Sequence, residues 1–188
     1  MSRNIFVFFP PGLGGNHVTN MLSTDPQFAS RYSVDDYKKI TDNAHPRNII
    51  NNTNMDLLDK DSSNVVCGHF GSYMWYIDSL QRFSNPQALI LKLPEDTTSK
   101  AYARVKQFQD DSFIENRYLY SEQATLYTMI GVQRMFGIYD CFEIDASQII
   151  FNRIIDGFLD FAKYDMGLEL NWSDCKKMYS NWYKKIVK

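Results

Sequence analysis

Hydrophobic residues along this 188-residue chain form short apolar runs that alternate with longer patterns of helical period. Four of the runs are mostly apolar and lack a strict apolar–polar alternation, which is typical of strands covered on both faces of a parallel sheet. These runs are Ile5–Phe9, Asn64–Cys67, Ala88–Lys92 and Asp140–Ile144. The pattern therefore predicts a parallel sheet that contains these four strands.

Between and after the strands, apolar residues recur at the spacing of a helix face. The segments with this spacing are Gly15–Ser23, Ser72–Phe83, Thr97–Phe108, Ser121–Phe136, Arg153–Lys163 and Ser173–Val187, and Ser173 is the expected N-cap of the last one. Strands that alternate with helices predict one α/β domain over residues 1–188, with three layers and a central parallel sheet flanked by helices. Residues 25–63 are rich in Asn, Asp and Ser, which predicts an irregular insertion near the site.

The composition excludes several classes of protein. Hydrophobic residues make up 44% and charged residues 22% of the chain, as in folded globular proteins. The net charge of −2 gives no overall basic field for nucleic acid or an anionic membrane. The three cysteines form no CxxC pair, so we expect buried thiols in a reducing compartment, without a disulfide framework or a zinc site. No apolar run is long enough for a signal segment or a membrane span, so we expect a cytoplasmic protein.

The first strand leads into a turn with two prolines and three glycines, and a helical pattern follows. Backbone N–H groups at such a helix start can bind a phosphate or sulfate, because the helix dipole favours negative charge there. Asn16 and His17 follow Gly15 where an ATP-hydrolysing P-loop has Lys-Ser/Thr, and the dinucleotide pattern GxGxxG also fails at His17. The alternative to an anion site is a tight turn that uses glycine only for its backbone geometry.

Two further segments place polar residues at or just after the carboxyl ends of predicted strands, where α/β sheets bind their ligands. His69 follows Gly68, and the near-neutral pKa of histidine suits a general base, although a histidine in such a turn is often structural. Lys92 ends the third strand ahead of a proline, and Lys92 and Ser99 could contact one phosphate. The alternative for this segment is a capped helix with charges that face solvent.

In this order the three segments resemble the sulfotransferase family, whose members transfer a sulfuryl group from 3′-phosphoadenosine 5′-phosphosulfate (PAPS). Pro11–Asn16 resembles the family's phosphosulfate-binding turn, and His69 matches its base. Lys92-Leu93-Pro94-Glu95-Asp96 with Ser99 is similar to its 3′-phosphate motif. Cys141–Asp145 looks like the late strand before the family's C-terminal helices, and Trp182 lies near the last turn. The resemblance spans nearly the whole chain and implies a P-loop-like fold.

The resemblance implies an in-line transfer to a hydroxyl acceptor, with His69 as general base and without a metal. His17 would add a positive donor at the helix start, whereas the alternative is a residue that faces solvent. The acceptor would be a small molecule or a carbohydrate, held by the loops at residues 25–63 and 109–118. The implied PAPS-binding residues are Gly12, Leu13, Gly14, Gly15, Asn16, His17, Val18, Lys92 and Ser99.

The chain departs from the family pattern at several positions. Gly12 stands where the turn usually has Lys or Arg, and Lys92 replaces an arginine, so a point charge replaces a bidentate fork. Ser99 comes one position early, and a late Arg-Lys-Gly triplet is missing. These departures favour an alternative, a non-catalytic binding protein on a degenerate sulfotransferase scaffold. A small P-loop-type phosphotransferase is a further alternative, although the missing Lys-Ser/Thr pair argues against it.

Overall fold

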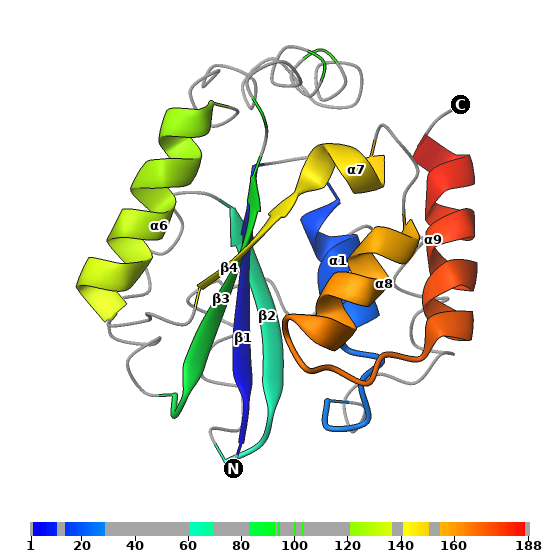
Figure 1. Ribbon diagram of the computed structural model, residues 1–188, viewed down its shortest axis with the longest axis horizontal. Coiled ribbons are helices and arrows are strands. Elements are labelled where there is room, and N and C mark those ends of the chain that lie inside the picture. The colour runs from blue at the N-terminus through cyan, green and yellow to red at the C-terminus, as the bar shows by residue number, and fades with distance from the viewer. Residues whose placement is uncertain are drawn as a thin grey trace.

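A four-stranded parallel sheet runs through the middle of the molecule in the computed structural model (Figure 1). The structure describes residues 2–10, 14–28, 61–69, 83–92, 94, 100, 103, 121–136, 141–150 and 155–186. The strands lie in the order β2-β1-β3-β4. They are β1 (Asn4–Phe9), β2 (Asn64–His69), β3 (Pro86–Lys92) and β4 (Cys141–Asp145). All four strands predicted from the sequence are therefore confirmed.

The described helices are α1 (Gly15–Leu22), α6 (Glu122–Phe136), α7 (Ala146–Ile150), α8 (Ile155–Tyr164) and α9 (Trp172–Ile186). Four of them were predicted from the sequence, and α7 was not. The start of α9 differs from the prediction, because the N–H of Asp174 is capped by Asn171 Oδ1 at 3.1 Å rather than by Ser173. Most of the insertion expected at 25–63 and nearly all of the helices expected at 72–83 and 97–108 lie outside the described residues. Within the two expected helices, Phe83 lies in a bend, and Lys100 and Ala103 are helical.

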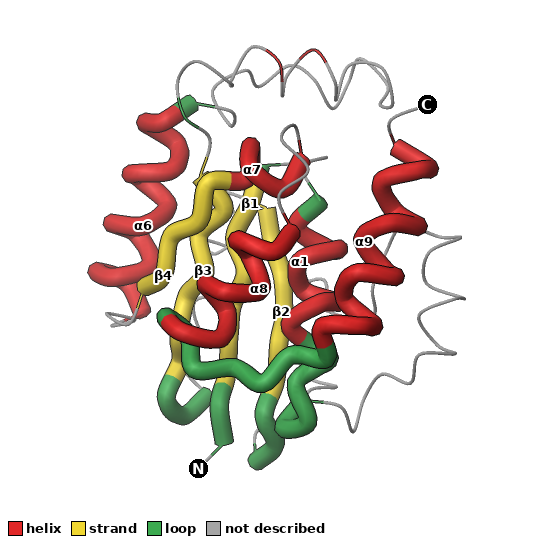
Figure 2. Tube along the Cα trace, turned by 45° about the vertical axis from the view of Figure 1, so that its right-hand side comes forward, coloured by secondary structure: helices red, strands yellow, loops and turns green. Residues whose placement is uncertain are grey.

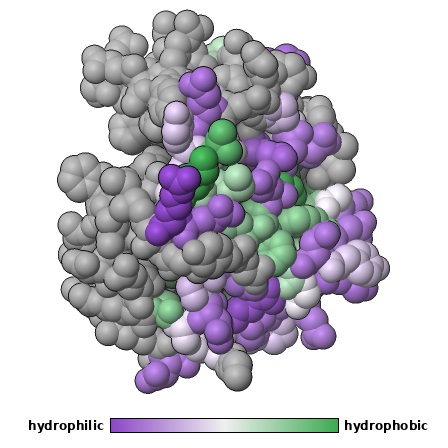
Figure 3. Space-filling view, turned by 60° about the vertical axis from the view of Figure 1, so that its left-hand side comes forward, coloured by the Kyte–Doolittle hydropathy of each residue, from purple (hydrophilic) through white to green (hydrophobic). Residues whose placement is uncertain are grey.

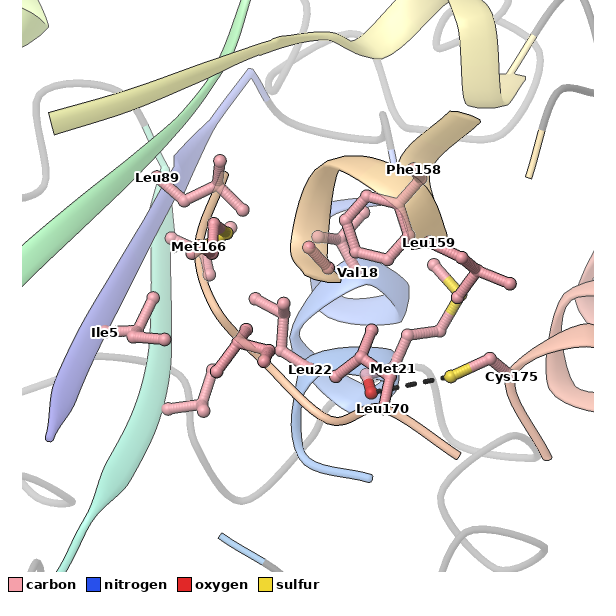
Figure 4. Packing of buried hydrophobic residues seen from close by; sticks show 14 of the residues in the cluster. Ile5, Val18, Met21, Leu22, Leu89, Phe158, Leu159, Met166, Leu170 and Cys175 are labelled. Carbon is pink, nitrogen blue, oxygen red and sulfur yellow. Dashed lines mark hydrogen bonds between the residues drawn. The ribbon is translucent and has the colours of Figure 1, made fainter. Parts of the chain in front are cut away.

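Helices cover both faces of the sheet (Figures 1 and 2). On one face, Ile5, Val7 and Phe9 of β1 belong to a core cluster shared with α1, α8 and α9 (Figure 4). The alternate residues Phe6 and Phe8 lie on the opposite face, toward α6, and are also buried. Burial on both faces explains why β1 is apolar throughout, and each such side chain contributes about 1.5–3 kcal/mol. The α/β class and a parallel sheet flanked by helices are thus confirmed.

The parallel strands bring all their carboxyl ends to one side of the sheet. We call this side, where the strands end at Phe9, His69, Lys92 and Asp145, the carboxyl edge, and the opposite side the amino edge. The chain goes from β1 to β2 on one side and then crosses to β3 on the other side of β1. Such a reversal makes the carboxyl ends of β1 and β3 a topological switch point, which is where open α/β sheets bind ligands.

A buried cysteine on α9 is hydrogen-bonded to α1 (Figure 4). The thiol of Cys175 is fully buried, donates to the carbonyl of Met21 and lies 3.2 Å from Thr24 Oγ1. Burial raises the pKa of Cys175 to about 11, so the group is a protonated thiol at neutral pH. The expectation of buried thiols is confirmed for Cys175, whereas Cys141 on β4 is only partly buried and the side chain of Cys67 is not described. None of the described helices is long and apolar enough to cross a membrane.

Candidate functional site

The first turn of α1 lies at the carboxyl edge, directly after β1. Gly14 occupies the N-cap position in a left-handed conformation, with φ 76° and ψ 14°, which favours glycine. The N–H of Val18 donates to the carbonyl of Gly14 at 2.9 Å and closes the first helical turn. No side chain within the described ranges caps this helix. The positive end of the helix dipole therefore lies at the carboxyl edge, as an anion site requires.

Two glycines of this turn are needed for close packing. A Cβ on Gly15 would lie 2.0 Å from ring carbons of Phe9, and a Cβ on Gly14 would lie 2.7 Å from Trp182 Cζ2. The glycines therefore let α1 approach the end of β1 on one side and α9 on the other. This packing supports the tight-turn interpretation of the glycines, and it leaves the anion-site interpretation open. Gly12 and Leu13 lie outside the described residues.

His17 is buried between α1 and α9. Its ring stacks on the Trp182 indole, with ring centroids 4.8 Å apart and an interplanar angle of 7°. Burial lowers the pKa of His17 to about 3, so the imidazole is neutral at physiological pH. The structure thus corrects two expectations for this residue, because it neither carries a positive charge nor faces solvent. Neither point could be predicted locally, since both depend on the indole of a distant helix.

Four ring side chains pack together where α9 meets the glycine turn before α1. They are His17, Tyr179, Trp182 and Tyr183, which are linked by stacked, tilted or edge contacts, and we call them the aromatic wall. Trp182 and Tyr183 are only partly buried, and the Tyr179 hydroxyl donates to the carbonyl of Ile149. The helical spacing of Tyr179 and Trp182 predicted a shared apolar face. Their contact with the glycine turn was not predicted, because nothing local in the sequence pairs the two ends of the chain.

The backbone of His69 ends β2 directly opposite Phe9 of β1. Adjacent strands lie about 4.8 Å apart, so the end of β2 is a neighbour of the strand that feeds the glycine turn. The structure therefore brings these two sequence motifs together at the carboxyl edge. It describes the backbone of His69 and not its side chain, so the role of the imidazole stays a prediction.

Lys92 ends β3 opposite Asp145 of β4. Its Nζ lies 3.0 Å from Glu143 Oε2, and the two side chains are 46% and 35% exposed. Strand alternation places Lys92 on the face of the sheet that α6 covers, whereas α1 packs on the other face. Lys92 and the glycine turn thus share an edge, but the lysine contacts a carboxylate that sequence reasoning had not considered. Ser99 lies outside the described residues.

Together, the described groups at the carboxyl edge are suited to an anion with an attached ring. The helix dipole supplies partial positive charge, Lys92 supplies an exposed cation, and the aromatic wall supplies flat apolar surface. No group of three or more His, Cys, Asp or Glu side chains that could hold a metal ion occurs in the described part of the chain. In comparisons with known proteins, no family model matches the sequence and no curated protein matches it.

Proposed function

We propose that this protein is a PAPS-dependent sulfotransferase with a P-loop-like domain, which transfers a sulfuryl group to a hydroxyl acceptor at the carboxyl edge. The observation that carries the proposal is the order of three strands. The strand before the glycine turn, β1, has as its direct neighbours β2, which ends at His69, and β3, which ends at Lys92. These are the three segments that resemble the phosphosulfate turn, the base and the 3′-phosphate motif of sulfotransferases.

In this proposal the first turn of α1 holds the 5′-phosphosulfate. His69 takes the proton of the acceptor hydroxyl as its oxygen forms a new bond to sulfur. The bond from sulfur to the bridging oxygen breaks, and adenosine 3′,5′-bisphosphate (PAP) leaves. Negative charge that builds on the bridging oxygen is stabilised by the backbone N–H groups of the turn, and one such donor contributes about 3–4 kcal/mol in other enzymes. Because His17 is neutral, the backbone amides and the helix dipole stabilise this charge without a contribution from a charged imidazole.

Lys92 would bind the 3′-phosphate, together with Ser99. The two anionic groups of PAPS are separated by a ribose, so a ligand that spans the ends of β1 and β3 suits a site with the dipole at one strand and the cation at the next. To reach the phosphate, Lys92 must leave Glu143. Both side chains are partly exposed, and such a surface pair contributes only about 0–1 kcal/mol, so its opening is a small cost.

A second candidate function is a non-catalytic binding protein on the same scaffold. Two observations favour it, namely the neutral His17 and the pairing of Lys92 with Glu143. Such a protein would hold a ligand with an aromatic or sugar ring against the partly exposed aromatic wall. It would show no requirement for a 3′-phosphate.

Thermal unfolding with PAP, and with AMP as the matched ligand without a 3′-phosphate, tests the nucleotide site. PAP at about 100 times its Kd adds about 2.7 kcal/mol, which raises the Tm by about 6–10 °C for a chain of this size. Lys92→Ala should weaken PAP binding and leave AMP binding unchanged. Lys176→Ala is the control, because Lys176 is a similarly exposed lysine paired with Asp156, on α8. No shift at millimolar PAP would rule out the nucleotide site.

The chemical role of His69 needs a separate measurement. His69→Ala should abolish sulfuryl transfer from PAPS while the shift with PAP persists. Transfer at the wild-type rate by this variant would remove His69 from the role of base. A wild-type protein that binds PAP but never releases it from PAPS with any hydroxyl acceptor would select the non-catalytic binding protein.

A further inference from the structure

The carboxylate that contacts Lys92 belongs to a residue that lies behind the carboxyl edge. Lys92 ends β3 opposite Asp145, whereas Glu143, whose Oε2 lies 3.0 Å from Lys92 Nζ, is opposite Ile90. A parallel strand rises about 3.3 Å per residue, so the backbone of Glu143 lies about 6.6 Å short of the end of β4. The contact therefore ties the ammonium group of Lys92 to a residue behind the edge, instead of leaving it to extend outward toward a ligand.

Asp145 is closer to Lys92 in register, but its carboxylate is engaged at the start of α7. Its Oδ1 accepts from the N–H of Ser147 at 2.8 Å, and its Oδ2 lies 3.5 Å from Gln148 Nε2. These contacts hold Asp145 on its own side of the strand end. Glu143 is thus the described carboxylate that pairs with Lys92.

The pair of Lys92 and Glu143 is open enough to exchange partners. The two side chains are 46% and 35% exposed, on the side of the sheet that α6 covers. Figure 3 brings this side forward and shows hydrophilic groups at the surface among apolar ones. Ion pairs as exposed as this one shift an equilibrium by at most about fivefold. A phosphate monoester carries more negative charge than one carboxylate, so it can take the lysine over.

We propose that Glu143 is a positioning residue that competes with the 3′-phosphate of the ligand for Lys92. This inference rests on the proposed function and adds a regulation of the same site. In the empty site Glu143 holds Lys92 behind the carboxyl edge, and the lysine moves to the 3′-phosphate when the nucleotide binds. When PAP leaves, Glu143 takes the lysine back. Because PAP is the product of the proposed reaction, this exchange favours product release, a step that limits the turnover of many enzymes.

Calorimetric titration with PAP tests the competition. Glu143→Gln keeps the size of the side chain and removes its charge, so this variant should bind PAP about threefold more tightly than the wild type. The dissociation of PAP, followed by stopped-flow displacement, should be correspondingly slower. AMP, which has no 3′-phosphate, should bind both proteins equally.

Asp156→Asn is the matched control for the loss of one negative charge. Asp156 lies on α8, and its carboxylate is paired with Lys176 at 2.8 Å. This variant should bind PAP like the wild type, because the charge is removed away from the carboxyl ends of β3 and β4. Circular dichroism and thermal unfolding would establish that both variants are folded.

A second background separates an action through Lys92 from a direct repulsion between Glu143 and the phosphate. In Lys92→Ala, the further change Glu143→Gln should leave the affinity for PAP unchanged, because no lysine remains to be released. A gain in affinity that persists in this background would overturn the positioning role. Equal binding of PAP by the wild type and Glu143→Gln would also overturn it and leave the nucleotide site intact. Failure of both proteins to bind PAP would rule out the nucleotide site itself, and the role of Glu143 with it.

Discussion

At the amino edge of the sheet two polar side chains are buried and hydrogen-bonded to each other, whereas at the carboxyl edge a charged pair at the ends of β3 and β4 is partly exposed. Asn4 and Asn64 lie opposite each other at the start of β1 and β2, and both are almost fully buried. Asn64 Nδ2 donates to Asn4 Oδ1 at 2.7 Å, and Asn4 Nδ2 donates to the carbonyl of Ser84 at 2.7 Å. At the other edge, Lys92 and Glu143 form a partly exposed pair.

This difference separates structural from functional use of polar groups. A slip of one residue between β1 and β2 would separate the two asparagines and leave buried amides without their partners, so the pair fixes the register of the strands. At the carboxyl edge, the described groups that could contact a ligand include the backbone amides of the first turn of α1 and the exposed Lys92. Changes at the amino edge should therefore affect stability alone, and changes at the carboxyl edge should also affect binding.

The largest effect is expected for Gly15→Ala, because the new Cβ would overlap the Phe9 ring at 2.0 Å. Overpacking of this kind should lower the free energy of unfolding by about 3 kcal/mol, measured by urea denaturation. Gly14→Ala should cost about 2 kcal/mol, since it combines a left-handed backbone with a contact of 2.7 Å to Trp182.

Gly167→Ala is the matched control for Gly14→Ala. Gly167 has a similar φ of 64°, but no atom lies within 4 Å of the position of its Cβ. It should therefore cost only the backbone strain, about 1 kcal/mol. Adding Trp182→Ala should make Gly14→Ala no more costly than Gly167→Ala, because the close contact is then gone. Equal costs for both glycines in the wild-type background would show that α9 does not constrain the glycine turn.

The elements that were predictable are those whose pattern reflects local burial. Strand β1 is buried at every position, and its apolar run shows this directly. The apolar face of α9 was equally visible, because its buried residues repeat at helical spacing. Helix α7 was missed because it is only five residues long and follows β4 without a break. Its start is fixed by Asp145 Oδ1, which accepts from the N–H of Ser147 at 2.8 Å.

The candidate site was predictable in its backbone and not in its side-chain contacts. Glycine, histidine and lysine at the ends of predicted strands indicated a shared edge, because parallel strands bring their carboxyl ends together. The burial of His17 and the contact between Trp182 and Gly14 depend on how the last helix packs against the first. The pairing of Lys92 with Glu143 depends on the register between β3 and β4. No local pattern carries this long-range information.

The next largest effect is expected at the amino edge. Asn64→Leu should lower the free energy of unfolding by about 2 kcal/mol, because the buried amide of Asn4 loses its partner. Asn4→Leu should cost a similar amount, while the double variant should cost less than the sum, since no buried amide is left without its partner. Urea denaturation of the wild type, the two single variants and the double variant measures the coupling energy between Asn4 and Asn64. Strict additivity, or a change in PAP binding caused by Asn64→Leu, would contradict a purely structural role for this edge.

The smallest effect concerns His17, which lies at the carboxyl edge but is buried like the asparagines at the other edge. Its pKa is about 3 in the folded protein and 6.5 in the unfolded chain, so between these values the unfolded state binds the extra proton. Stability is therefore fully present above pH 6.5 and falls by up to about 1.4 kcal/mol for each pH unit below it.

His17→Phe keeps a ring against Trp182 and removes the group that titrates, so the free energy of unfolding of this variant should depend less on pH between pH 5 and 6.5. On going from neutral pH to pH 5.5, the wild type should lose about 1.4 kcal/mol more than the variant. Both proteins contain the same carboxylates, so the contribution of these groups to the pH dependence cancels when the two proteins are compared. Identical pH slopes would mean that His17 is hydrated in solution and that α9 does not close over the first turn of α1. In that case the carboxyl edge would be more open than the packing of Trp182 indicates, and a protonated His17 could act on an anion there after all.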